Sequence, residues 1–363
     1  MINSSRLREL KQKYNQFFND SSPGQILCLI CPYTFPIDYR AYGLESGRGL
    51  DTWDYDRDLE KFIFNSVKSL RAFMDYTKDL DNDYVPALNP HFGYGDHSAF
   101  FSGENVIMGE ETSWTHPFLT SWDKLPELKL DRNRYWYRKI LESFEYYKKY
   151  WEGDYLLASY SHAGPGDMAN AIRGNALFYD LYDEPDRVHT LMDRCADAAI
   201  QLAQDIAEIT DPVNREMGEG NVAANVWFPG NAPYISEDFN DLCSADQYLE
   251  FGAKYTQKII SHFGGAFIHH HARGRHIHQE VAKLKHLKLL EISLDPKCPR
   301  PVDDLPRLFE EHNGLPLMIR CHADDLEDNI EDLKRGRVVI MLNVESLEQA
   351  REAVKLIRKN SII

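Results

Sequence analysis

Three consecutive histidines, His269, His270 and His271, end the apolar run 264–268. Alternate side chains of an extended strand share a face, so His269 and His271 are expected to point one way and His270 the other. Two neutral imidazoles at a strand end could bind a metal ion or act as an acid/base pair, and they could equally bond a substrate or the backbone. The spacing therefore predicts that the chemistry of this protein lies near residue 270.

Further histidines follow this run at positions 276, 278 and 286. They fall in the helical segment expected after the strand, and their spacing predicts exposure to solvent.

Apolar runs alternate with helical patterns along the chain. Eight of these runs are expected to be strands, at residues 25–31, 84–88, 155–160, 222–228, 265–270, 287–292, 315–320 and 338–342. The clearest helical patterns cover residues 186–209 and 346–358. Runs that are apolar throughout fit strands buried on both faces, so the alternation favours an α/β fold of the (β/α)8 TIM barrel type over an open sheet.

Two additions to this barrel are expected. A helix at residues 4–19 lies within an N-terminal extension of residues 1–24, and a hairpin is inserted around residues 105–111. No repeat, low-complexity tract or linker divides the remainder, so residues 1–363 are expected to form a single domain.

Residues directly after the strands of a TIM barrel form its active-site face. Arg273, Arg275 and Arg320 follow neighbouring strands of a chain that is otherwise acidic. Such a local reversal of charge predicts that they bind an anionic group of the substrate, and ordinary pairing with nearby acids is the alternative.

Other candidates come from the remaining strand ends and from the expected hairpin. The catalytic candidates are His91, His162 and Glu111. The further substrate-binding candidates are Trp227, Tyr160 and Asn343. Glu111 could supply a general acid or be a solvated hairpin residue, and the two aromatic residues could line a pocket or belong to the core.

Charge and composition restrict the class of protein. A formal net charge of −16 disfavours nucleic-acid binding, which needs a basic face. Six cysteines in 363 residues do not form a dense disulfide framework. No apolar stretch approaches the ~20 residues of a membrane span, and the polar N-terminus does not read as a signal peptide, so a cytoplasmic protein without membrane partners is expected.

One segment is similar to a known superfamily. It begins Gly164-Pro165-Gly166-Asp167 and continues through Arg173-Gly174 to the run 178–185, FYDLYDEP. This segment resembles the "GP-x-D…RG…DLYD-x-P" stretch of the uroporphyrinogen decarboxylase superfamily, which includes zinc-dependent methyltransferases of corrinoid proteins and to which cobalamin-independent methionine synthase is related. The resemblance extends from about residue 80 to the C-terminus and implies a TIM barrel.

The resemblance implies two different sites. The decarboxylase branch binds substrate carboxylates through an arginine-rich "RQAGRY" motif, whereas the first strand here ends in Cys31-Pro32-Tyr33. The methyltransferase branch holds zinc through His-x-Cys after the fifth strand, a Glu in methionine synthase, and a late Cys. The matching residues here are His269, His271 and Glu291, with Ser346 in place of the late Cys, so the resemblance implies a zinc site without thiolates.

Three functions are compatible with these residues. The first is a metal-assisted methyltransferase of the corrinoid-linked type that acts on a small anionic substrate, with zinc as cofactor and a corrinoid protein as partner. The second is a decarboxylase of a tetrapyrrole or a smaller carboxylate, which needs no cofactor. The third is a barrel that binds a small molecule without catalysis.

Overall fold

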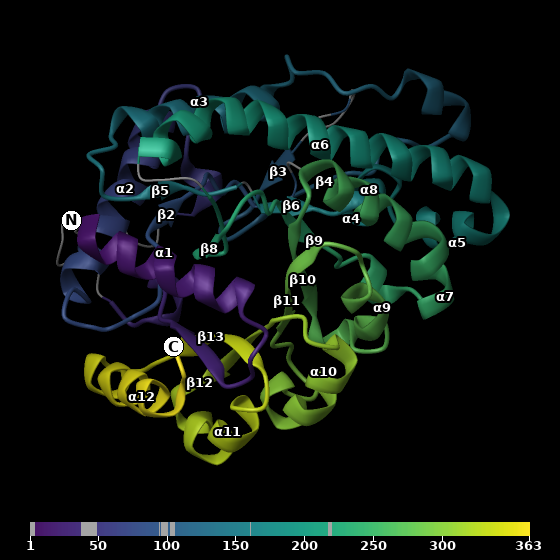
Figure 1. Cartoon of the computed structure of the whole chain (residues 1–363). Helices are drawn as coiled ribbons and strands as arrows, with labels where there is room; N and C mark the ends of the chain where they lie inside the picture. The colour runs from purple at the N-terminus through teal and green to yellow at the C-terminus, as the bar shows by residue number, and fades with distance from the viewer. Residues whose placement is uncertain are drawn as a thin grey trace.

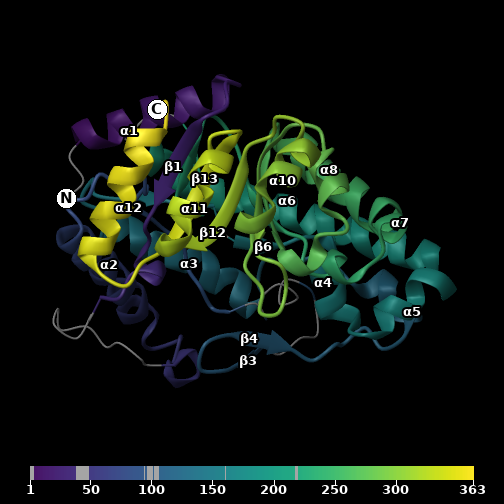
Figure 2. The same cartoon turned by 90° about the horizontal axis from the view of Figure 1, so that it is seen from below.

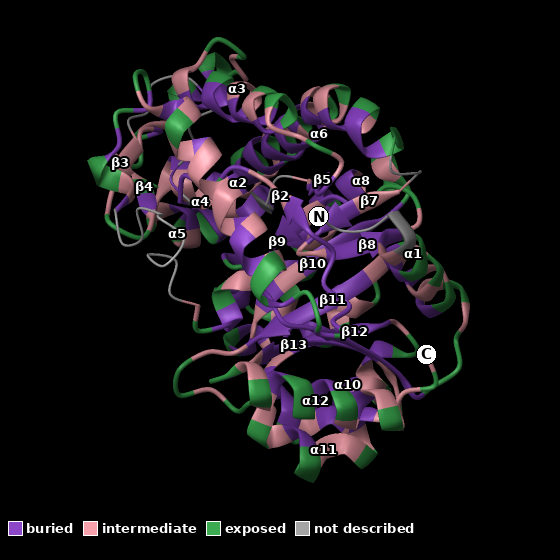
Figure 3. Cartoon of the chain, turned by 90° about the vertical axis from the view of Figure 1, so that its left-hand side faces the viewer, coloured by how far each residue is buried: buried purple, intermediate pink, exposed green. Residues whose placement is uncertain are grey.

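A parallel sheet of seven strands forms the centre of the molecule (Figure 1). The computed structural model describes residues 4–37, 49–93, 95, 101, 106–159, 161–216 and 220–363, with the side chains of residues 4, 5 and 161–163 left aside. In sheet order the strands are β1 (Gln25–Leu29), β13 (Arg337–Asn343), β12 (Leu317–His322), β11 (Leu287–Ser293), β10 (Ala266–His271), β9 (Tyr234–Ser236) and β6 (Ser161–Ala163). Most of their residues are buried, as Figure 3 shows, which explains why the strands are apolar throughout.

A second parallel pair, β2 (Ala87–Leu88) with β5 (Leu156–Leu157), extends the arrangement around the core. Strand β5 pairs with β2, and β6, which follows β5 closely in the chain, pairs with β9. The described strands do not form one unbroken closed ladder. Their order and direction are nevertheless consistent with a TIM barrel, the architecture expected from the sequence.

Side chains occupy the edge of β1 that faces away from β13. One backbone bond links the amide of Asp83 to the carbonyl of Cys28, at 2.8 Å. Asp83 Oδ2 accepts a hydrogen bond from the Cys28 amide, while the amide group of Asn82 both accepts from the backbone of Ile30 and donates to it, at 3.0 and 2.6 Å. These two side chains therefore take the place of a neighbouring strand.

Replacing Asn82 by alanine is expected to lower the free energy of unfolding by about 2–4 kcal/mol, because it leaves two buried backbone groups of Ile30 without partners. Urea unfolding followed by circular dichroism measures this loss. The matched control is Asn133→Ala, at an exposed position, which should change stability by less than about 0.5 kcal/mol. An equal, small effect of both substitutions would show that the hydrogen bonds of Asn82 at the edge of β1 do not contribute to stability.

Helices cover the outside of the strands. They are α1 (Ser4–Asn19), α2 (Leu59–Tyr76), α3 (Tyr135–Lys149), α4 (Pro165–Arg173), α5 (Ala176–Asp183), α6 (Pro185–Glu216), α7 (Ala245–Gln247), α8 (Ala253–Phe263), α9 (His278–Ala282), α10 (Leu305–His312), α11 (Leu326–Leu333) and α12 (Leu347–Asn360). In Figure 2, α11 and α12 lie along β1, β12 and β13, with α12 in contact with β1. Among the described residues, no helix combines the length and the apolar character that crossing a bilayer requires.

Two antiparallel hairpins accompany the parallel strands. The hairpin β3 (Val106–Met108) with β4 (Ser113–Thr115) lies where the sequence predicts one. The run 222–228 was expected to be one barrel strand, and this expectation is wrong. It folds as the hairpin β7 (Asn221–Ala223) with β8 (Val226–Phe228), because Ala224 and Asn225 both adopt positive φ and turn the chain.

The β7–β8 hairpin packs between α1 and the main sheet. The ring of Phe228 lies 4.9 Å from that of Phe18 in α1 and 6.2 Å from that of Phe267 in β10. The helix predicted at residues 4–19 is confirmed with those bounds. The N-terminal extension is thus part of the packed core.

Candidate metal centre

The end of β10 presents the histidines as the alternation predicts. Helix α8 ends at Gly264, whose φ of 75° redirects the chain into the strand. His269 and His271 line a cleft at the carboxyl ends of the strands, whereas His270 is fully buried on the opposite face. The orientation of all three side chains is therefore confirmed.

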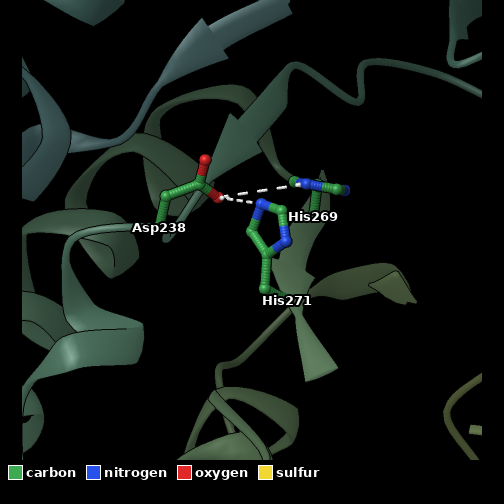
Figure 4. Close-up of side chains that lie close together, drawn as sticks. All are labelled: Asp238, His269 and His271. Carbon is green, nitrogen blue, oxygen red and sulfur yellow. Dashed lines mark ion pairs between the residues drawn. The ribbon is translucent and has the colours of Figure 1, made fainter. Parts of the chain in front are cut away.

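Asp238 completes a cluster with these two imidazoles. It lies two residues after the end of β9 and before the short helix η6 (Asn240–Leu242). Its Oδ1 is 3.9 Å from His269 Nε2 and 3.5 Å from His271 Nε2, and one donor atom of each residue lies within 4.8 Å of the other two (Figure 4). In Figure 4 the carboxylate faces both rings.

Each imidazole is fixed from behind by a second carboxylate. His269 Nδ1 lies 2.9 Å from Glu291 Oε2, and His271 Nδ1 lies 2.7 Å from Asp295 Oδ1. A carboxylate at Nδ1 favours the tautomer with its proton on that nitrogen, which leaves the Nε2 lone pair directed at the cluster. This carboxylate–histidine pairing is typical of histidines that bind metal ions.

The structure places Glu291 behind His269 and not in the cluster, which corrects the ligand set taken from the family resemblance. The Glu291 side chain is 1% exposed, and its other oxygen accepts a hydrogen bond from Arg320 Nε at 2.9 Å. Burial by itself favours the protonated acid, but the charge of Arg320 and the contact with His269 outweigh it and lower the pKa of Glu291 to about 2. Glu291 is therefore an anion that orients His269.

Asp238 and His271 stabilise each other's charged forms. The hydrogen bond with Asp238 raises the pKa of His271 to about 9 although burial opposes this, and Asp295 adds to the effect. Burial favours the protonated form of Asp238, but His271 and His269 outweigh it and lower the pKa of this carboxyl to about 2. Without a cation between them, Asp238 and His271 are thus an ion pair.

The donor atoms fit a metal ion in spacing and type. Ligand atoms about 2.0–2.1 Å from a tetrahedral zinc ion lie about 3.4 Å from one another. The carboxylate oxygen lies 3.5 and 3.9 Å from the two imidazole nitrogens, close to that value, and all three atoms lie within 4.8 Å of one another. Two imidazole nitrogens and one carboxylate oxygen also form a donor set that leaves one position of a tetrahedral ion open.

The "GPGD" segment brings α4 against the cluster. Asp167, in the first turn of α4, accepts hydrogen bonds from the amides of Gly164 and Phe239, at 3.3 and 2.5 Å. A Cβ atom on Gly164 would lie 2.1 Å from the carbonyl oxygen of Ser236, so only glycine allows this approach to the end of β9. Burial, followed by the nearby charge of Asp238, raises the pKa of Asp167 well above its ordinary range.

A cleft of about 610 Å³ opens above these residues. It brings together four of the predicted site residues: His269, His271, Arg273 and Arg320. Its other lining residues are Asp167, Asn170, Ala171, Tyr234, Ser236, Asp238, Phe239, Asp241, Leu242, Ser293, Leu294 and Asp295. The cleft is therefore rich in acids around a pair of arginines.

Two predicted substrate ligands belong to other environments. Arg275 forms ion pairs with Glu311 and Asp304 and does not line the cleft, so the alternative of ordinary pairing holds for it. Trp227 is buried in β8, with Lys11 Nζ 5.7 Å from its ring, and belongs to the core.

Three of the remaining candidates also lie away from the described cleft. Asn343 ends β13 beside His322 and is absent from the lining. Glu111 is exposed in the turn of the β3–β4 hairpin, and His91 is exposed after β2. The backbone of His162 lies in β6 but its side chain is outside the description, and Tyr160 lies outside the described residues.

A chain of buried imidazoles extends from the far side of β10. His270 Nδ1 lies 3.1 Å from Asp241 Oδ1, and His270 Nε2 lies 2.5 Å from His278 Nδ1. His278 Nε2 is 2.6 Å from His312 Nε2, and the Nδ1 atom of His312 is 3.1 Å from the carbonyl oxygen of Leu315. The expectation that His278 is exposed is wrong, because this chain ties the end of β10 to α9 and α10.

Sequence reasoning missed Asp238 and the role of Asp295. Asp238 follows β9, a strand of three residues after Pro233 that carries no apolar run, so no strand end was expected there. Asp295 lies within the stretch expected after β11, but nothing in its spacing ties it to His271. The signal for Asp238 was its place in the segment Glu237-Asp238-Phe239, which lies within the part of the chain, from about residue 80 onward, that resembles the superfamily.

Comparison with known proteins supports the fold. No family model matches the sequence, and no curated protein matches it. Among solved structures, the chain is similar to a methyltransferase from Methanosarcina mazei, with a TM-score of 0.66 and 13% sequence identity, over 96% of this chain and 98% of that one. At this identity the match shows a shared fold over nearly the whole length, in agreement with the fold expected from the sequence.

Proposed function

We propose that Asp238, His269 and His271 bind a divalent metal ion, with zinc the best fit, and that the protein is a metal-assisted methyltransferase acting on a small anionic substrate. The observation that carries the metal site is the convergence of three donors, two of which are held by a carboxylate at Nδ1. The shared fold with a methyltransferase supports the class of reaction. The resemblance of residues 164–185 supports a methyl-corrinoid on a partner protein as methyl donor.

The donor set constrains the substrate. An ion held by two imidazoles and one carboxylate keeps more positive charge than one held by thiolates, so it would act as a strong Lewis acid on an oxygen or nitrogen atom. Arg320 and Glu291 hold His269 in place, and Asp295 does the same for His271. Burial raises the pKa of Asp167, which places a carboxyl group suited to proton transfer on the wall of the same cleft.

A cofactor-free decarboxylase is the second candidate, because two arginines line the cleft and could hold carboxylates. The octacarboxylate uroporphyrinogen would need several converging guanidinium groups, and Arg275 is bound elsewhere in ion pairs. A smaller carboxylate fits this alternative better.

Metal content separates these functions. Protein purified without a histidine tag and loaded with zinc is expected to retain about one ion per chain after dialysis, measured by elemental mass spectrometry. The loaded protein is then expected to consume methylcobalamin in the presence of small carboxylated acceptors, followed by the absorbance of the cobalt–methyl bond, and Asp238→Asn should be inactive. A metal-free protein that binds uroporphyrin at micromolar concentration would instead favour the decarboxylase.

A further inference from the structure

We infer that Arg273 and Arg320 form a subsite for a single carboxylate, and that the ligand of the cleft is a small organic acid with a short apolar body. This inference deepens the proposed function by naming the substrate class, and only the contact of the ligand with a metal ion rests on that function. Both arginines line the same cleft as the Asp238–His269–His271 cluster.

Arg273 supplies the first positive charge of this subsite. Its side chain is exposed at the start of the loop after β10, and no acid among the described residues pairs with its guanidinium. Its backbone amide donates to Asp295 Oδ2 at 2.9 Å, which fixes the position of the residue beside His271. An arginine held in this way at the wall of a cleft is available to an anionic ligand.

The guanidinium of Arg320 is held in place, but only some of its hydrogen-bond donors have partners among the described residues. Its Nε donates to Glu291, and its guanidinium lies 5.8 Å from the centre of the Tyr33 ring, so the plane of the group is fixed from two sides. The terminal nitrogens of the guanidinium have no hydrogen-bond partner among the described residues, and the side chain is 33% exposed. Arg320 can therefore donate to a second acceptor without losing Glu291.

The acids around the arginines do not neutralise them. Asp241 accepts from His270 and from the backbone of His271, Asp295 accepts from His271 and the backbone of Arg273, and Asp238 pairs with His271. The same acids oppose highly charged ligands, since each further negative charge on a ligand is repelled by them. A carboxylate with one charge is accordingly favoured over a phosphate with two.

The rest of the lining describes the body of the ligand. Phe239, Leu242 and Leu294 supply apolar surface to the lining of the same cleft. A short alkyl or aromatic segment buried there contributes about 25 cal/mol for each Å² removed from water. Inorganic ions lack this contribution, so an organic acid should bind more tightly than phosphate.

The test compares pentanoate with its uncharged amide and with inorganic phosphate, by ligand-observed NMR titration of the full chain. Pentanoate is expected to bind more tightly than pentanamide or phosphate. Arg273→Gln should weaken pentanoate binding by about 10- to 100-fold and leave pentanamide unchanged, because only the charged hydrogen bonds are lost. The control Arg335→Gln, at a 63% exposed side chain paired with Asp332, should have no effect.

The outcomes separate this inference from the metal proposal. Equal binding of pentanoate to the wild type and to Arg273→Gln would overturn the subsite, as would tighter binding of phosphate than of pentanoate. Pentanoate binding that depends on Arg273 in the Asp238→Asn protein would support the subsite even if no metal ion binds. Arg273 is exposed, so its replacement leaves the buried Arg320–Glu291–His269 contacts intact.

Discussion

Replacing His269 by alanine is expected to abolish measurable zinc binding, and Asp238→Asn to weaken it by more than about 100-fold. Each change removes one of three protein ligands, the usual minimum of a catalytic zinc site. Glu291→Gln removes only the partner of His269 Nδ1 and should cost about 10- to 100-fold. Competition with a chromophoric chelator measures the zinc affinities of these variants and so ranks them. Circular dichroism shows that each variant is folded.

The matched control for the ligand variants is His322→Ala. His322 ends β12, is exposed and does not line the cleft, so its removal should leave zinc affinity unchanged. Equal losses in the His322 and His269 variants would mean that zinc binds to surface histidines. A variant of Glu291 that loses as much affinity as Asp238→Asn would return Glu291 to the ligand set.

A fall of about 3 kcal/mol in the free energy of unfolding is expected as the pH decreases from about 6.5 to 4. Burial lowers the pKa of His312 from its ordinary 6.5 to about 4, and burial together with His270 lowers that of His278 well below 6.5. Between these values the unfolded chain binds more protons than the folded one, so stability rises with pH across the window. The stability is complete above pH 6.5 and is lost as the pH falls toward 4.

Urea titrations between pH 7.5 and 4.5 measure this loss. His312→Gln removes one of the two buried groups and should flatten the dependence of stability on pH, although it lowers stability at pH 7.5. The exposed His286 is the control position, and His286→Gln should keep the wild-type slope. An unchanged slope in His312→Gln would show that the buried imidazoles do not determine the acid limit.

Much of the fold follows from patterns in the sequence. The helix at residues 4–19, the β3–β4 hairpin and the strands around β1, β10, β11, β12 and β13 were expected within a few residues, because each has a long periodic or apolar run. Strands were also expected at residues 84–88 and 155–160, which contain β2 and β5, but β9 and the turn between β7 and β8 were not expected. β9 has three residues and the β7–β8 turn depends on positive φ at Ala224 and Asn225, so neither carries a periodic signal.

The part of the site that comes from a single strand could be predicted from the sequence. Alternation along β10 is enough to place His269 and His271 on one face, and both line the cleft. Asp238 comes from another strand, and its approach depends on the register between β9 and β10, in which Ser236 pairs with His269. Packing of the whole sheet determines this register, so the spacing of residues along the chain does not predict it.

The hydrogen bonds of Asn82 and Asp83 along the edge of β1 also affect how molecules associate with one another. Cys28 and Ile30 would present unpaired backbone groups if Asn82 and Asp83 withdrew, and exposed strand edges are templates for pairing with another chain. These two side chains, together with the backbone bond from Asp83 to Cys28, therefore protect this edge from pairing with another chain as well as filling its hydrogen bonds. Arg358 and Lys13 hold Asp83 by ion pairs, so the protection of this edge is anchored to both ends of the chain.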